Sequence, residues 1–276
     1  MIQHILRRLL DSVPTLIGVS VLTFVLMRLP GGDPVRLLLG PEAKPEVVEA
    51  ARVQLGFDQH LVIQYFYMMW ALLTGTLQSI THQRPVIQLL AERLPDTIEL
   101  AVAAMFFATL TGVIVGTVSA VWRGGVVDNV SRFVVFVFLA MPGFWLGLEL
   151  IILFARELEW FPPAGRGAPF TTQWLSHLVL PALTLGLGTG AFLSRILRSS
   201  MLEVLQKDFV RTARAKGLDE PTVIIKHALR NALIPFVTVA GLATGAMLGG
   251  AVIVEYIYNW PGVGRLLYES IRQRDF

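Results

Sequence analysis

The chain has 276 residues, of which 54% are hydrophobic and only 16% are charged. Soluble chains average roughly 45–50% apolar and about 25% charged residues, so this composition, with a mean hydropathy of +0.62, excludes an ordinary soluble domain. The sequence contains no cysteine, which excludes disulfides, iron–sulfur ligation by cysteine and thiol catalysis. The net charge of +3 is small, so the positions of the charged residues are more informative than their sum.

Apolar residues gather in blocks that are long enough to cross a membrane. A spanning helix needs roughly 20 mostly apolar residues to cross about 30 Å of hydrocarbon. Five blocks meet this length: Leu9–Leu29, Ile98–Val121, Phe133–Phe154, Leu178–Leu197 and Ile234–Val254. The sequence therefore predicts an all-α polytopic membrane protein. The first block has a polar start and lacks a cleavage site, so it is interpreted as an anchor and not as a signal peptide.

Basic residues set the predicted orientation, because Lys and Arg accumulate in cytosolic loops. Arg7 and Arg8 precede the first block, Arg123 and Arg132 follow the second, and segment 195–230 carries eight basic against four acidic residues. The N-terminus is therefore expected in the cytosol.

This orientation divides the chain into four parts. Residues 1–29 form the N-terminal cytosolic end and first span, and 30–97 an external (periplasmic) segment. Residues 98–254 form a transmembrane core with a cytosolic loop at 198–231, and 255–276 a second external segment. Five spans leave the last segment outside, so a sixth span is expected after Phe276.

The external segment 30–97 is expected to carry structure of its own. Pro30–Pro34 has turn chemistry, and residues 46–55 have helical propensity. Residues 61–73 are rich in Tyr and Trp, which favours a helix at the membrane interface; this helix could be a lid over the bundle or a docking surface. Asp96 and Glu99 are interpreted as charges at a helix N-terminus, where the helix dipole favours them.

Two sets of glycines recur at four-residue spacing within the blocks. Gly112 and Gly116 share one face of the second block, and Gly241, Gly245 and Gly249 share one face of the fifth. Small residues let membrane helices approach closely, so both faces are predicted packing surfaces.

Glu149 is the clearest carboxylate at membrane depth. Lipid exposure of such a group costs roughly 2.5–3.5 kcal/mol on insertion scales. It could line an aqueous substrate path, or it could reach the outer interface or pair with Arg156.

Enzyme motifs are missing. There is no Gly-x-x-x-x-Gly-Lys-Ser/Thr loop for phosphate, no paired histidine spacing for a metal and no Gly-x-Ser-x-Gly elbow. The chain is therefore not expected to be an enzyme or to bind a cofactor or metal itself.

The loop between the last two blocks is densely basic. Val210, Ala213 and Gly217 would form a face of small residues beside Arg211 and Arg214. Gly217 would break the helix, and Pro221 would separate it from a second short helix at 223–231. A small face ringed by charge suits the groove of a soluble partner; a polybasic helix on anionic lipid is the alternative.

The stretch Arg211–Gly217 resembles the signature loop of permease subunits of binding-protein-dependent ABC importers. Ala213 and Gly217 match the family pattern, whereas Arg211 and Thr212 replace its first two members, as in the dipeptide, oligopeptide and nickel branch. Further matches are Pro30–Pro34, Leu94–Thr97, His227–Asn231 and the external motif Glu255, Trp260, Pro261, Gly262 and Gly264.

The resemblance implies a type I ABC importer transmembrane fold in a bacterial inner membrane. It also implies a second homologous permease, two cytosolic subunits that bind ATP and Mg, and an external substrate-binding protein, with no nucleic acid. The ATPase-coupling residues would be Arg211, Thr212, Ala213, Arg214, Gly217, Leu218 and His227. The substrate would be a di- or oligopeptide; nickel is the alternative, although no Met- or His-rich stretch favours it.

Overall fold

The computed structural model describes residues 2–28, 35, 43–54, 56–169, 171–273 and 275. Those residues form helices and no strand, apart from one isolated bridge between Gln78 and Pro85. The predicted turn at Pro30–Pro34 lies outside them. The chain divides into two compact units, one made of Met1–Glu92 with Tyr268–Phe276, the other of Arg93–Leu267.

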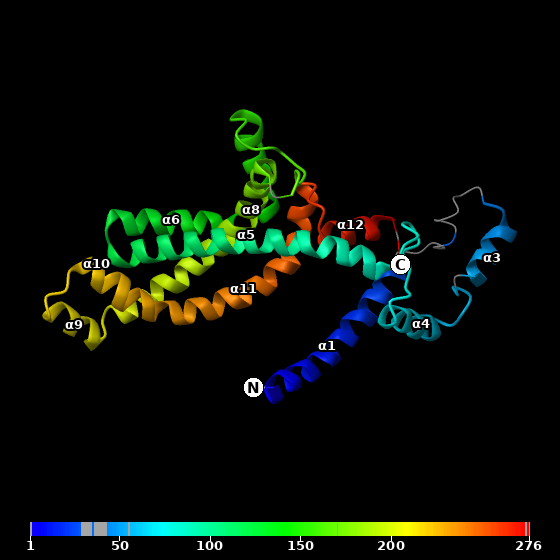
Figure 1. Cartoon of the computed structure of the whole chain (residues 1–276), viewed down its shortest axis with the longest axis horizontal. Helices are drawn as coiled ribbons and strands as arrows, with labels where there is room; N and C mark the ends of the chain where they lie inside the picture. The colour runs from blue at the N-terminus through cyan, green and yellow to red at the C-terminus, as the bar shows by residue number, and fades with distance from the viewer. Residues whose placement is uncertain are drawn as a thin grey trace. The chain divides into compact units, whose positions relative to one another are not determined.

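The first unit contains three helices of the N-terminal part (Figure 1): α1 (Ile2–Arg28), α3 (Pro45–Gln54) and α4 (Leu61–Leu73). The helices expected at 46–55 and 61–73 are thus present. Ser20 of α1 shares a hydrogen bond of 2.8 Å with the Tyr65 hydroxyl of α4. The outer face of α4 exposes Phe66, Tyr67 and Trp70.

The spans of the second unit begin with α5 (Val86–Val121), followed by α6 (Val126–Ala140), α7 (Gly143–Leu150) and the π-helical segment η1 (Ile151–Glu157). Next come α8 (Thr172–Val204), α9 (Asp208–Ala215), α10 (Glu220–Thr222), the π-helical segment η2 (Val223–Leu229), α11 (Arg230–Ile257) and α12 (Val263–Gln273), which runs on into the first unit.

Three helices of the described residues are long and apolar enough to cross a membrane: Val86–Val121, Thr172–Val204 and Glu220–Gly249. A fourth crossing would have to be the pair formed by α6 and the α7–η1 helix, and the apolar stretch Leu10–Leu26 of α1 is shorter than these three. The predicted count of five spans is therefore met only in part by length and composition.

The expected span at 133–154 is not one continuous helix, because the chain bends by 106° between Ala140 and Gly143. Pro142 lacks a backbone N–H and crowds the residue before it, which disfavours helical backbone there. Met141 and Pro142 both adopt extended backbone, with ψ of 127° and 133°.

α5 begins twelve residues before the predicted boundary at 98, at Val86. Asp96 and Glu99 therefore lie in the interior of a helix, and their interpretation as charges at a helix N-terminus is wrong.

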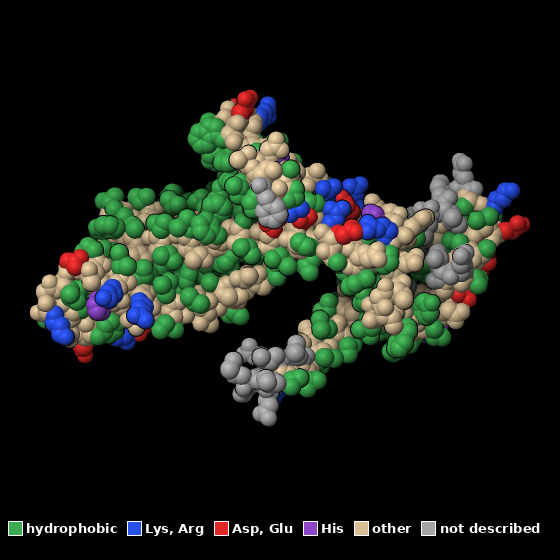
Figure 2. All heavy atoms as spheres, viewed as in Figure 1, with side chains coloured by type: hydrophobic (Ala, Val, Ile, Leu, Met, Phe, Trp, Pro, Cys, Tyr) green, Lys and Arg blue, Asp and Glu red, His purple; other side chains and the backbone are tan. Residues whose placement is uncertain are grey.

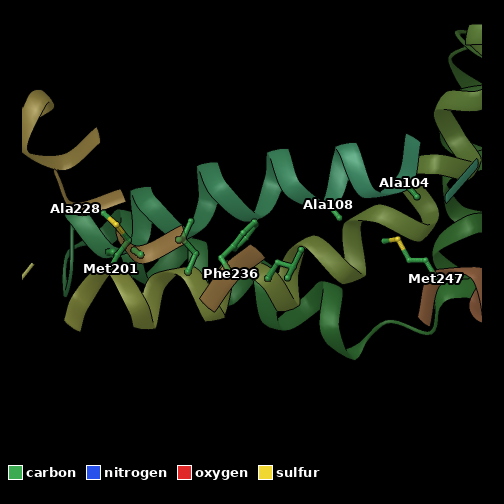
Figure 3. Close-up of a cluster of buried hydrophobic side chains, with 10 residues drawn as sticks. Ala104, Ala108, Met201, Ala228, Phe236 and Met247 are labelled. Carbon is green, nitrogen blue, oxygen red and sulfur yellow. The ribbon is translucent and has the colours of Figure 1, made fainter. Parts of the chain in front are cut away.

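Glycines bring α5 and α8 together as parallel neighbours. A methyl group on Gly116 would lie 2.8 Å from the Ser194 carbonyl oxygen, and one on Gly186 would lie 2.7 Å from that of Ala104. A methyl group on Gly112 would lie 3.0 Å from Leu193 and 3.1 Å from Phe236 of α11. Figure 3 shows Phe236 pointing toward α5 within this core, with Met201 and Ala228 at one end of it.

The second glycine face differs. No side chain or neighbouring backbone of the described chain comes within 4 Å of a methyl group placed on Gly241, Gly245 or Gly249. Packing of α11 through these glycines against another helix of this chain is therefore not observed.

Large apolar side chains cover the outside of α5 and α6 (Figure 2), as expected of helices that meet lipid or another membrane subunit.

Candidate functional site

The predicted break at Gly217 is present and closes α9. Gly217 has φ of +79°, a region that favours glycine. Its N–H donates to the Arg214 carbonyl at 2.9 Å, and the N–H of Leu218 donates to the Ala213 carbonyl at 3.4 Å. This pair of bonds is the Schellman arrangement that ends helices. The chain therefore reverses sharply between α9 and α10.

An ion pair spans this reversal. The Arg214 guanidinium donates to both carboxylate oxygens of Glu220, at 3.1 and 2.6 Å. The hydrogen bond and the charge of Glu220 raise the pKa of Arg214. Such a two-point contact fixes orientation as well as distance, so it holds α10 against the end of α9.

Asp219 caps the next helix. Its carboxylate accepts the N–H of Thr222 at 3.3 Å, and hydrogen bonds from Thr222 lower its pKa. Pro221 lies in the first turn of α10, where its missing N–H costs nothing. The predicted second helix after the break is therefore present, but Pro221 lies in its first turn and not before it, and the helix begins at Glu220 and continues through η2 into α11.

The small face of α9 is covered by the chain itself. Val210 and Ala213 are buried, at 0% and 5% exposure, and they pack with Val223 of η2. The prediction that this face is free to enter a partner's groove is therefore wrong, because η2 already occupies it. Ala213 supports the loop from inside.

The other predicted coupling residues lie on the accessible side of the loop or beside it. The exposed residues are Arg211, Thr212, Arg214, Gly217 and Leu218, together with Ala215 and Ile225, which the sequence did not indicate. His227 is half-buried in η2, and its carbonyl accepts the Asn231 amide at 2.7 Å. Figure 2 shows charged side chains of both signs at this end of the second unit.

The motif at 255–264 surrounds a buried carboxylate. Glu255, at 0% exposure, accepts the Thr97 hydroxyl at 2.7 Å and the N–H of Arg265 at 2.9 Å. The Thr97 oxygen in turn accepts the N–H of Val263 at 2.8 Å. Trp260 is also fully buried, and its indole N–H donates to the Asp96 carbonyl at 2.9 Å. These bonds join α5 to the end of α11 and the start of α12.

The glycines of this motif make room for Glu255. A methyl group on Gly262 would lie 2.2 Å from Glu255 Cδ, and one on Gly264 would lie 2.6 Å from Val252 Cα. Pro261 contributes its carbonyl, which accepts Arg93 at 3.4 Å. The motif is thus a packing unit built around one carboxylate.

Sequence reasoning missed an ionic cluster at the same end of α5. Arg166 contacts Asp96 at 2.6 Å and Glu99 at 2.7 Å. The Trp174 indole N–H also donates to Glu99. Arg166 is the only Lys or Arg between residues 157 and 194, and two carboxylates one turn apart on α5 could have suggested its partners.

Glu149 is exposed on α7, and no hydrogen bond or ion pair with Arg156 is found among the described residues. Groups of three His, Asp or Glu side chains that could hold a metal ion are also not found within the described ranges.

The described residues thus form a bundle of long apolar helices in which a charged loop, α9 to α10, connects α8 to the helix that continues into α11. This arrangement is that of a membrane permease. The model for the binding-protein-dependent transport system inner membrane component matches residues 112–276, and the model for the N-terminal part of such membrane components matches residues 1–101. The chain belongs to this family, the permease subunits of ABC importers, in which separate subunits hydrolyse ATP.

Curated relatives agree with this assignment. The glutathione transport system permease protein GsiC of Pectobacterium atrosepticum is 44% identical over the whole chain and 89% of its own length, and that of Escherichia coli K12 is 42% identical over the same shares.

Solved structures show the same fold at low identity. The inward-facing MetNI methionine ABC transporter matches with a TM-score of 0.55 at 20% identity, over 68% of this chain and 82% of that one. The expected type I importer fold is thereby confirmed.

Proposed function

We propose that this permease forms half of a translocation pathway for peptide-sized substrates. Glutathione, named for the curated relatives, is a tripeptide, and the substituted loop at Arg211–Gly217 resembles the dipeptide, oligopeptide and nickel branch. A second homologous permease would supply the other half, in a bacterial inner membrane with the N-terminus of this chain in the cytosol.

The observation that carries the coupling role is the closed reversal at Gly217. The Arg214–Glu220 pair and the Val210–Ala213–Val223 cluster make the loop a firm projection from α8 and α11. A firm projection transmits movement, because displacement at its tip must move the helices on which it is built. Each of two cytosolic ATPases, holding ATP and Mg, would receive one such loop from one permease.

Reconstitution of the complex with its external binding protein tests this function. We expect ATP hydrolysis to rise when the binding protein is loaded with glutathione or a dipeptide, and not with Ni²⁺. Stimulation by Ni²⁺ alone would favour the nickel alternative. Transport that proceeds without any ATPase subunit would contradict the coupling role itself.

A further inference from the structure

A cavity of about 470 Å³ lies between the C-terminal part of α5, the helix α6 and the C-terminal part of α8. This size falls within the roughly 300–1,000 Å³ of small-molecule sites. Its lining includes three arginines, Arg132, Arg195 and Arg198, and four serines. We name it the arginine cavity.

Two of the three arginines, Arg198 and Arg132, share one carboxylate, that of Asp128. Asp128, at 1% exposure, accepts Arg198 at 3.0 and 2.9 Å and also the Ser119 hydroxyl at 2.6 Å and the Gly124 N–H at 2.9 Å. Arg132 forms a longer ion pair with the same carboxylate, at 3.5 Å from Nε to Oδ1, and also donates to the side-chain oxygen of Asn129.

Arg195 forms no hydrogen bond or ion pair with any residue that the structure describes, and it is exposed on α8. Arg132 is 56% exposed. The three arginines of the cavity therefore share the single negative charge of Asp128, which leaves a net charge of +2 (three minus one). A charge at a membrane helix is costly unless an anion or water compensates it.

The cavity continues into an apolar wall on α6. Phe136 and Leu139 follow Arg132 at i+4 and i+7, which places them on the same face of the helix, and both line the cavity with Val135. Phe136 is 68% exposed. A ligand that fits this lining has an anionic head and a long apolar part.

We propose that the arginine cavity binds an anionic phospholipid, with the headgroup phosphate between Arg132 and Arg195 and an acyl chain along Phe136 and Leu139. Basic pockets between membrane helices suit anionic headgroups. A lipid carries its phosphate at the membrane interface, and the arginines of the cavity lie toward the start of α6 and the end of α8, where the interface is expected.

The test uses the assembled complex in nanodiscs of phosphatidylcholine with or without phosphatidylglycerol, followed by native mass spectrometry. We expect the wild type to retain phosphatidylglycerol. The double variant Arg132→Gln/Arg195→Gln should weaken retention about 30-fold, since each basic residue near the surface contributes roughly fivefold. Arg123→Gln removes an exposed arginine on the turn between α5 and α6, outside the cavity, and should change retention less than twofold.

Equal retention by wild type and double variant would overturn the proposal, as would an equal loss in Arg123→Gln. Displacement of the lipid by millimolar inorganic phosphate would show that only the arginines act and that the apolar wall does not. A cross-link from Ser131→Cys to the second permease would show a protein in the cavity. Co-purification of the ATPase subunits should stay unchanged, which separates lipid loss from misassembly.

Discussion

The Thr97 hydroxyl donates to the buried Glu255 carboxylate at 2.7 Å, although 158 residues separate them. The same oxygen accepts the N–H of Val263, so one hydroxyl connects α5, α11 and α12. A buried carboxylate needs every such donor, because an unmatched charge in an apolar surrounding carries a large desolvation cost.

Thr97→Val keeps the shape of the side chain but removes both bonds of the hydroxyl. We expect a loss of roughly 1.5–3 kcal/mol in the free energy of unfolding, the range for a hydrogen bond to a charged group. Thermal unfolding of the purified subunit measures it. Thr97→Ser keeps the hydroxyl and should recover most of the loss; equal melting temperatures for Val and wild type would contradict this role.

Gly262→Ala tests the space around Glu255. The added methyl group would lie 2.2 Å from Glu255 Cδ, so the carboxylate must shift away from Thr97. Overpacking of this kind costs typically about 1–3 kcal/mol. Gly143→Ala adds a methyl group at an exposed position with no neighbour within 4 Å and should melt like the wild type.

The long apolar helices and the break at Gly217 could be predicted from the sequence, because hydropathy and glycine backbone freedom are local properties. Partners could not. The spacing of Gly112 and Gly116 is the same as that of Gly241 and Gly245, yet among the described residues only the first pair meets neighbours. Spacing defines a face of a helix, and the fold decides what covers it.

The same reasoning explains the error at Ala213. Its small side chain was read as a surface for another protein, but η2 folds back and buries it beside Val223. The bend at Pro142 was foreseeable from the proline itself, whereas its 106° angle depends on how α7 packs on α8 and α11.

Substitution of glycine by alanine should lower the stability of the subunit on one glycine face and raise it on the other. Gly116→Ala places a methyl group 2.8 Å from a backbone oxygen of α8 and should destabilise the subunit by about 1–3 kcal/mol. A methyl group on Gly245 has no neighbour within 4 Å among the described residues, so Gly245→Ala should stabilise α11 by up to about 1 kcal/mol through helix propensity. Melting curves of the two single variants compare them directly, and a loss of stability in both would refute the distinction.

Gly245→Leu extends this test to assembly. The isolated subunit should fold, whereas pairing with the second permease should fall if the open glycine face of α11 packs against it. Co-purification of a tagged second permease measures the pairing. Undiminished pairing and transport would show that Gly241, Gly245 and Gly249 face lipid or an open space.

Substitutions on the two sides of α9 should separate folding of the loop from docking. Ala213→Asp buries a carboxylate in the Val210–Val223 cluster and should disorder the loop, raising hydrogen exchange over 208–222. Gly217→Val should also disorder the loop, at a cost of order 1–3 kcal/mol, because its φ is +79°. The cost is backbone strain alone, since no neighbouring atom lies within 4 Å of the added Cβ. Normal exchange in both variants would show that neither position supports the loop.

Ala215→Asp tests docking itself, because Ala215 is the exposed last residue of α9. The loop should keep its wild-type hydrogen exchange. An unpaired carboxylate enclosed by a partner costs several kcal/mol, which corresponds to an association at least about a hundredfold weaker. ATPase co-purification and substrate-stimulated hydrolysis should therefore fall, while pairing with the second permease survives. Ala215→Ser, of similar size and without charge, should behave as wild type. If Ala215→Asp couples normally, this side of α9 does not face the ATPase, and the basic loop is a surface helix at the membrane.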